Sequence, residues 1–258
     1  MAVESITLRH GDVVAEVVPA RGALVSRLQV GPTDVLFMDR TTLEDPSKSV
    51  RGGIPILFPF AGRLVQDTLV HAGSVMKQHG FGRNRAWAVG ERLDHKVTLI
   101  LQPDVETRAV YPHEFTVEQT VMLLPRGLNV EMLVTNRGSR VMPVSPGWHP
   151  YFNCPAKQKG AVKCDAAGFP PEKFVDDVEF DFGITAPANG RARFEVPGMG
   201  KMTLSFSPEM RFLQFWSLPG RDFVCLEPFY GPNNTINTEK RAEIAPGESR
   251  VFWMRIEV

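Results

Sequence analysis

Two side chains that can exchange protons stand out because each lies in a turn-like stretch crowded with aromatic residues. His149 lies in "SPGWHPYFN" and Glu227 in "FVCLEPFYGPNNTINT". Glu227 follows an apolar, strand-like run and precedes a proline, so we expect a carboxylate that must find hydrogen bonds or shift its pKa. A carboxylate and an imidazole that share one pocket can act as general base and general acid.

A third stretch supplies another histidine and several arginines. It runs through "RGGIPILFPFAGRL" to "QHGFGRNRAW" and contains His79. A single loop histidine is most often held by an ordinary hydrogen bond, and most aromatic residues belong to the core. Aromatic rings beside charged groups also suit a sugar, because its C–H faces stack on rings while its hydroxyls take directional hydrogen bonds. The sequence therefore permits a saccharide site, with Trp148 and Phe229 as its expected aromatic contacts.

Neither a metal ion nor a cofactor is expected. His71, His79 and Asp67 show none of the compact spacings of known metal sites, and the cysteines lack a C-x-x-C pair. The glycines of "RGGIPILFP" and "GFGRNRAW" do not form a G-x-G-x-x-G phosphate loop.

Composition limits the partners. The 258 residues include 29 basic and 29 acidic side chains, so no net field favours nucleic acid or an anionic membrane. Three cysteines, an odd number, argue against a disulfide framework and for a reducing compartment. No apolar run approaches the roughly 18 residues that cross a bilayer, and the N-terminus lacks a signal-peptide pattern. We expect a soluble cytoplasmic protein, a monomer or homodimer, with a small-molecule partner.

Short alternating segments must position the chemical groups. Residues 115–124 and 127–136 alternate with a period of two, and a proline and a glycine supply the turn between them. Further strands are predicted at 12–19, 96–102, 201–207 and 250–258. We predict an all-β fold, a large antiparallel β-sandwich, as a single domain over residues 1–258. Residues 155–200, rich in Gly, Pro, Lys and Asp, are predicted to form long loops with short strands.

Several blocks, in this order, resemble the aldose 1-epimerase, or mutarotase, family. They are "RGGIPILFPFAGRL" with "QHGFGRNRAW", then "GWHPYFN", then "CLEPFYGPNNTINT" with the late "IAPGES". Each block alone is a weak signal, but together they run from residue 51 to near the C-terminus in the family's order. The resemblance implies that family's β-sandwich and an enzyme that interconverts the α and β anomers of a hexose by opening and closing its ring.

The resemblance also implies roles for individual residues. Glu227 matches the base that takes the proton from the anomeric hydroxyl, and His149 matches the acid that protonates the ring oxygen. His79 matches a second histidine that holds sugar hydroxyls, and Arg63 matches a sugar-contacting arginine. An unperturbed Glu titrates near about 4.3 and a His near about 6.5, so the imidazole needs an upward pKa shift to act as acid at neutral pH. We expect a nearby carboxylate to provide that shift.

The substrate stays open at this point. Galactose mutarotases carry "GRxANRI"-type and "NHxYFNL" motifs, whereas this chain has "FAGRLVQD" and "GWHPYFN", so galactose is not implied. The sugar-binding aspartate of those enzymes has no clear counterpart, and the candidates are Asp165, Asp176, Asp177 and Asp181.

Three arginines make a phosphorylated sugar an alternative substrate. "RGGIP" followed by "QHGFGRNRAW" also resembles the hexose-6-phosphate mutarotases, and Arg51, Arg83 and Arg85 are candidates to hold a phosphate. Alternatively, these arginines have no role in binding and pair with acidic neighbours on the surface. We favour an unphosphorylated or undetermined aldose and keep hexose-6-phosphate 1-epimerase as the alternative.

Two other classes of function fit the sequence less well. A non-catalytic carbohydrate-binding protein on the same scaffold would not need both Glu227 and His149, so their presence argues against it. A glycoside hydrolase or polysaccharide lyase is less favoured because hydrolysis usually calls for two carboxylates, and only one convincing carboxylate is found.

Overall fold

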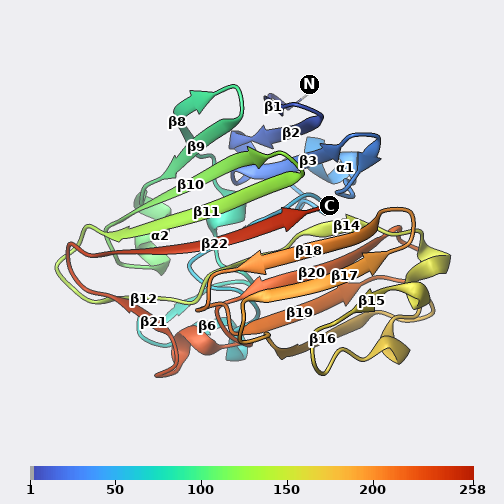
Figure 1. Cartoon of the computed structure of the whole chain (residues 1–258). Helices are drawn as coiled ribbons and strands as arrows, with labels where there is room; N and C mark the ends of the chain where they lie inside the picture. The colour runs from blue at the N-terminus through green and yellow to red at the C-terminus, as the bar shows by residue number, and fades with distance from the viewer. Residues whose placement is uncertain (1–2) are drawn as a thin grey trace.

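The largest sheet of the protein has eight antiparallel strands. The computed structural model describes residues 3–258 (Figure 1). The strand order is β15 (Lys163–Cys164), β17 (Arg191–Val196), β18 (Gly200–Phe206), β22 (Ser249–Glu257), β11 (Gly127–Asn136), β10 (Phe115–Leu124), β9 (Lys96–Leu101) and β8 (Ala88–Leu93). The predicted hairpin is present, because β10 pairs with β11 through a two-residue connection that places Leu124 opposite Gly127.

A second sheet of six strands carries most of the expected site. Its order is β16 (Phe180–Thr185), β19 (Phe212–Ser217), β20 (Phe223–Phe229), β13 (Gly147–Trp148) and β5 (Ile56–Leu57), and β14 (Tyr151–Asn153) also pairs with β20. Side chains alternate between two environments. Leu213 and Leu226 enter the main core, whereas Gln214 and Glu227 face the opposite side. One face of this sheet is therefore available for a cleft.

The two large sheets share one hydrophobic core. Val130 of β11 and Met254 of β22 belong to the same buried cluster as Phe215 and Leu226 of the second sheet. The cluster draws residues from near both ends of the chain, which supports the expected single domain; that domain assignment stays a prediction.

Smaller elements surround these layers. A four-stranded sheet contains β1 (Ile6–His10), β2 (Val13–Val18), β3 (Leu24–Val30) and β4 (Thr33–Asp34). The strand pairs are β12 (Met142–Val144) with β21 (Ala242–Ile244) and β6 (Thr68–Leu69) with β7 (Ser74–Val75). The α-helices are α1 (Arg40–Glu44) and α2 (Val105–Val110). Short 3-10 turns cover Pro19–Arg21, Val65–Asp67, Gly82–Asn84, Ala156–Ala161, Pro171–Lys173 and Thr235–Asn237.

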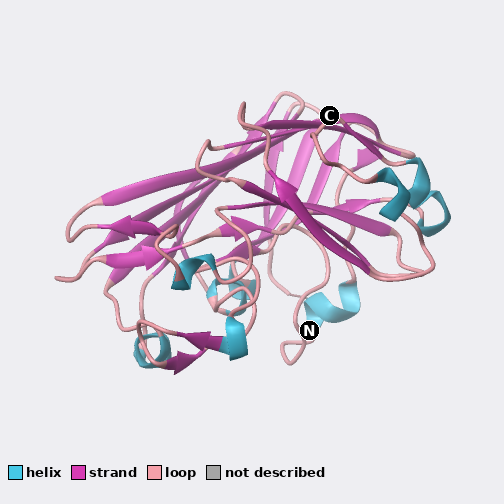
Figure 2. Ribbon diagram, turned by 90° about the horizontal axis from the view of Figure 1, so that it is seen from below, coloured by secondary structure: helices cyan, strands magenta, loops and turns pink. Residues whose placement is uncertain are grey.

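Strands form the body of the molecule, and short helical turns lie mostly along its margins (Figure 2). Within residues 3–258, no helix has both the length and the apolar character to span a bilayer. The predicted all-β antiparallel sandwich is confirmed. Residues 155–200 contain short strands joined by loops, as predicted, and also two 3-10 turns, which were not predicted.

Candidate active site

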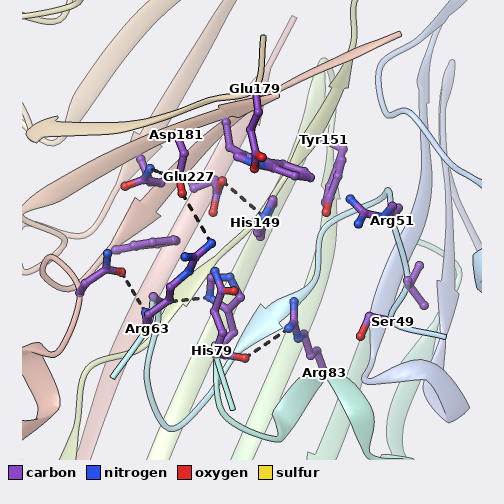
Figure 3. Close-up of a pocket in the computed structure, with 17 residues that line it drawn as sticks. Ser49, Arg51, Arg63, His79, Arg83, His149, Tyr151, Glu179, Asp181 and Glu227 are labelled. Atoms are coloured by element: carbon purple, nitrogen blue, oxygen red, sulfur yellow. Dashed lines mark hydrogen bonds and ion pairs between the residues drawn. The ribbon is translucent and has the colours of Figure 1, made fainter. Parts of the chain in front are cut away.

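A cleft of about 270 Å³ opens on the face of the six-stranded sheet that points away from the main core (Figure 3). Its lining comes from residues within 49–51, 62–83, 149–151, 179–181 and 214–233. The fold therefore brings together all three stretches that the sequence marked as chemically promising.

Strand β20 places Glu227 in this cleft. The antiparallel register sets Glu227 opposite Gln214 of β19, and both side chains line the cleft. Leu226, the preceding residue, points into the main core. Glu227 is only 1% exposed, and its Oε2 atom has no hydrogen-bond partner within residues 3–258. The carboxyl group is therefore buried and presented to the cleft with one oxygen unsatisfied.

His149 lies across from Glu227 between β13 and β14. The register pairs the flanking positions, Gly147 with Phe229 and Tyr151 with Cys225. His149 is midway between them, and its Nε2 atom lies 3.4 Å from Oε1 of Glu227. Its ring stacks on Tyr151 with centroids 4.6 Å apart and an interplanar angle of 11°. Strand pairing and ring stacking together fix the imidazole beside the carboxyl group.

His79 lines the cleft from a turn that Gly62 stabilises. The Gly62 N–H donates to Nδ1 of His79 at 3.0 Å, and the His79 N–H donates to the Gly62 carbonyl at 2.9 Å. Because Nδ1 accepts a hydrogen bond, the neutral ring carries its proton on Nε2. Burial, aided by the charge of Arg83, lowers the pKa of His79 well below its usual value. The ring is therefore a neutral N–H donor.

The pKa shifts of Glu227 and His149 contradict the expectation that a nearby carboxylate raises the pKa of His149. Burial raises the pKa of Glu227 well above its usual value, with Asp181 adding to the shift and Arg83 opposing it. Burial lowers the pKa of His149 to about 3, again with a contribution from Arg83. The carboxyl group does not raise the imidazole pKa as expected, because the desolvation of two buried groups outweighs their attraction. Since the 3.4 Å contact exceeds normal hydrogen-bond length and burial disfavours charge on both groups, we regard the pair as neutral, with its proton on Glu227.

Arginines occupy two sides of the cleft. In Figure 3, Arg51 and Arg83 lie on one side of His149, and Arg63 lies with Asp181 on the other. The Nη2 atom of Arg63 is 3.9 Å from Oδ2 of Asp181. Within residues 3–258, neither Arg51 nor Arg83 has a carboxylate oxygen within 4.0 Å, and both line the cleft. Arg83 donates to the carbonyl of Gln78, and the Arg51 guanidinium lies over the ring of Trp216.

Arg85 does not join this cluster, which corrects the expectation of three phosphate-binding arginines. Its Nη1 atom lies 2.7 Å from Glu106 and 3.3 Å from Asp104, in a different groove. These carboxylates flank the start of α2 and hold the guanidinium away from the cleft.

Among the four candidate aspartates, Asp181 lines the cleft. Gln214 donates a hydrogen bond to it, and burial raises its pKa. By contrast, Asp165 accepts the N–H of Arg193, and Asp176 binds the buried ammonium group of Lys159.

Trp148 was predicted to contact the sugar, and the structure corrects this prediction. It is fully buried in the main core, where its Nε1 atom donates to Oε1 of Gln119 at 3.3 Å. Consecutive strand residues point to opposite faces, so Trp148 points inward where its neighbour His149 faces the cleft. Gln119 also donates to the carbonyl of Ala23, which explains a polar residue in an apolar row. Phe229 does line the cleft, next to the ring of His79.

Several lining residues were not among the predicted site residues: Ser49, Gln78, Tyr151, Glu179, Gln214, Trp216 and Asn233. Tyr151 was within reach of sequence reasoning, because it follows His149 by two residues and a strand period places both on one face. Gln214 and Trp216 also share one strand face, but their partner strand is visible only in the fold.

A buried imidazole and a buried carboxyl group in contact, in a polar cleft of an antiparallel β-sandwich, are suited to moving protons within a small bound ligand. The family described as aldose 1-epimerase matches residues 4–257, and the chain belongs to this family. The predicted enzyme class, an isomerase of the aldose 1-epimerase type, is confirmed at this level.

Known proteins resemble the chain over different lengths. The solved structure of the Slr1438 protein from Synechocystis is 32% identical with a TM-score of 0.92, covering 100% of this chain and 96% of that one. A galactose mutarotase-like protein from Lactobacillus casei is 24% identical with a TM-score of 0.77, covering 98% and 99%. A Cenchrus ciliaris protein provisionally named glucose-6-phosphate 1-epimerase is 30% identical over 58% of this chain and 46% of its own length.

Proposed function

We propose that the protein interconverts the α and β anomers of a hexopyranose by acid–base catalysis at the His149–Glu227 pair. The observation that carries the proposal is the meeting of these two buried groups, 3.4 Å apart, in one polar cleft. Proton transfer by positioned side chains typically contributes about 10²- to 10⁴-fold each. Sugar ring opening already proceeds slowly in water. An acceleration of this size from the two side chains is therefore sufficient for the enzyme.

Each proton has a defined route in this mechanism. Glu227 accepts the proton of the anomeric hydroxyl while His149 gives a proton to the ring oxygen, and the bond from the anomeric carbon to that oxygen breaks. The aldehyde rotates about its bond to the neighbouring carbon. His149 then recovers its proton as the ring oxygen attacks the other face, and Glu227 returns its proton to the new hydroxyl.

The pair must hold one proton for this cycle. Burial raises the pKa of Glu227 and lowers that of His149, so before the sugar binds we place that proton on Glu227. A bound sugar brings hydroxyl dipoles into the cleft and so stabilises the charged arrangement, carboxylate with imidazolium. We therefore expect substrate binding to move the proton to His149 before ring opening.

Surrounding residues are suited to hold the sugar. His79 offers an N–H donor, Asp181 and Gln214 offer polar contacts, and Arg63 adds a guanidinium group on the exposed side. Phe229 supplies an apolar surface. These groups surround the acid–base pair and define one orientation for the ring.

A phosphorylated hexose is the second candidate substrate. Arg51 and Arg83 lie on one side of the pair without an acidic partner within residues 3–258, and Ser49 adds a hydroxyl there. Guanidinium groups match phosphate oxygens in geometry and charge. Relatives provisionally named glucose-6-phosphate 1-epimerases support the same reading.

Anomer exchange measured by NMR separates these substrates. Pure anomers of glucose, galactose and glucose 6-phosphate would be compared at matched concentrations, with the uncatalysed rate subtracted. Faster exchange of any one of these sugars supports the epimerase function. A faster reaction with glucose 6-phosphate than with glucose supports Arg51 and Arg83 as the residues that bind the phosphate. No acceleration of any would overturn the epimerase in favour of a non-catalytic carbohydrate-binding protein. The cytoplasmic location and the monomeric or dimeric state stay predictions.

A further inference from the structure

One buried thiol lies beside the acid–base pair and has no part in ring opening. Cys225 precedes Glu227 by two residues on β20, is 1% exposed, and is paired in register with Tyr151. Its Sγ atom, a ring nitrogen of His149 and a carboxylate oxygen of Glu227 all lie within 4.8 Å of one another. Sequence spacing did not reveal this group, because the ligands come from two separate segments.

The polar atoms of this group are short of partners. Oε2 of Glu227 and Nδ1 of His149 are buried without a hydrogen-bond partner within residues 3–258. Buried polar atoms are normally paired, so unpaired ones indicate a ligand or a catalytic role. The ring-opening mechanism uses the carboxyl group of Glu227 and one nitrogen of His149. It does not use the thiol of Cys225.

We propose that His149, Cys225 and Glu227 form a binding site for a zinc ion that switches the enzyme off. Thiolate and imidazole ligands with one carboxylate are typical of Zn²⁺, which prefers four ligands in a tetrahedron. The site supplies three, and the cleft gives access to a water molecule as the fourth.

The distances suit this ion. Zinc bonds of about 2.0–2.1 Å to nitrogen and oxygen place two tetrahedral ligand atoms about 3.3 Å apart. Nε2 of His149 is already 3.4 Å from Oε1 of Glu227. The 4.8 Å limit on the whole group leaves Cys225 within a small side-chain movement of its place in the tetrahedron.

Charge also balances. A thiolate and a carboxylate cancel the two charges of the ion, so the loaded site is neutral despite its burial. The thiol and carboxyl protons leave to the buffer as the metal bonds form. Zinc then occupies the lone pairs that would accept and return the sugar protons, so the metal-loaded enzyme cannot carry out the proton transfers of ring opening. The inhibition rests on the proposed epimerase function, whereas metal binding does not.

The test titrates the purified full chain with zinc sulfate and measures anomer exchange, with EDTA reversal. Cobalt chloride in place of zinc gives a thiolate-to-metal absorption band that reports binding without any activity. Cys225→Ala should keep basal exchange and lose the cobalt band. Its zinc affinity should fall about 100-fold or more, since loss of even an outer-shell partner costs about 10- to 100-fold.

Cys154→Ala is the matched control, because Cys154 is an equally buried cysteine that is not part of the His149–Cys225–Glu227 group. It should behave as the parent protein. Equal zinc inhibition of the parent and Cys225→Ala would overturn the proposal, as would a missing cobalt band at millimolar metal. If no exchange is found in the parent protein, a cobalt band that is lost in Cys225→Ala and displaced by zinc still supports the metal site. That outcome rejects only the proposed function.

Discussion

Nε2 of His149 lies 3.4 Å from Oε1 of Glu227, although the two residues come from separate segments of the chain. The contact follows from strand register, because β13 and β14 pair with β20 on either side of it. Both side chains are buried, and the directions of their pKa shifts favour a neutral pair. A pair with one shared proton can serve both directions of ring opening and closure.

The pH dependence of kcat/KM should report this shared proton. The active pair holds one proton, so activity falls when it gains a second or loses its only one. The second proton adds near the His149 pKa of about 3, and the last proton leaves above the usual Glu value of 4.5. We expect a broad profile with no loss of activity as pH falls through 6.5, the usual value for histidine. An acidic limb centred at 6.5 in NMR exchange rates would contradict this.

Glu227→Gln should stabilise the fold at neutral and alkaline pH. The folded-state pKa of Glu227 is raised, so the native protein binds this proton more tightly than the unfolded chain does. Stability is therefore lost as pH rises from 4.5 through the folded pKa, and glutamine avoids that loss. Each pKa unit corresponds to about 1.4 kcal/mol. Each kcal/mol moves Tm by about 2–4 °C in a chain of this size.

Thermal melts from acidic to alkaline pH check this stabilisation. The Tm advantage of the variant should be absent below pH 4.5 and grow above it. A constant difference at every pH would mean that the proton of Glu227 is not its cause.

His79→Asn should distinguish the structural role of Nδ1 from the role of the Nε2–H donor in activity. The asparagine oxygen can accept the Gly62 N–H as Nδ1 does, and asparagine tolerates the φ of +70° at this position. The Nε2–H donor is lost. A hydrogen bond to developing charge contributes about 1.5–3 kcal/mol, so kcat/KM should fall about 10- to 150-fold with Tm nearly unchanged. His71→Asn, outside the cleft, is the control; equal activity in both variants would remove His79 from the mechanism.

Arg83→Gln and Arg85→Gln form a matched test of phosphate recognition. Arg83 lines the cleft, whereas Arg85 pairs with Asp104 and Glu106 elsewhere. If the substrate is a hexose 6-phosphate, Arg83→Gln should raise its KM about tenfold or more, and Arg85→Gln should leave it unchanged. Steady-state kinetics with glucose and glucose 6-phosphate measure both. Equal effects of Arg83→Gln on the two sugars would argue against a phosphate contact.

Strand periodicity made the fold largely predictable. The alternating segments at 115–124 and 127–136 became β10 and β11, because a two-residue period requires one buried face. The other predicted strands also appear, as β2, β9, β18 and β22. Motif resemblance pointed to His149, Glu227, His79 and Arg63, and the fold brings all four to one cleft.

The errors made from the sequence have two causes, local alternation along a strand and contacts between distant segments. Trp148 and His149 are neighbours in sequence, yet alternation sends the tryptophan into the core. Arg85 is close to Arg83, but acidic residues near α2 hold it elsewhere. Asp181 was not distinguishable from three other aspartates, because its position opposite Trp216 follows from the pairing of β16 with β19.

Replacement of Glu227 by glutamine tests the central claim most directly. The amide keeps the size of the side chain and removes the proton acceptor, so anomer exchange on the preferred sugar should fall about 10²- to 10⁴-fold. Sugar affinity, measured by calorimetry, should stay within about tenfold of the parent, and Glu118→Gln on β10 should leave exchange unchanged. Exchange at the parent rate in the Glu227→Gln protein would contradict the account.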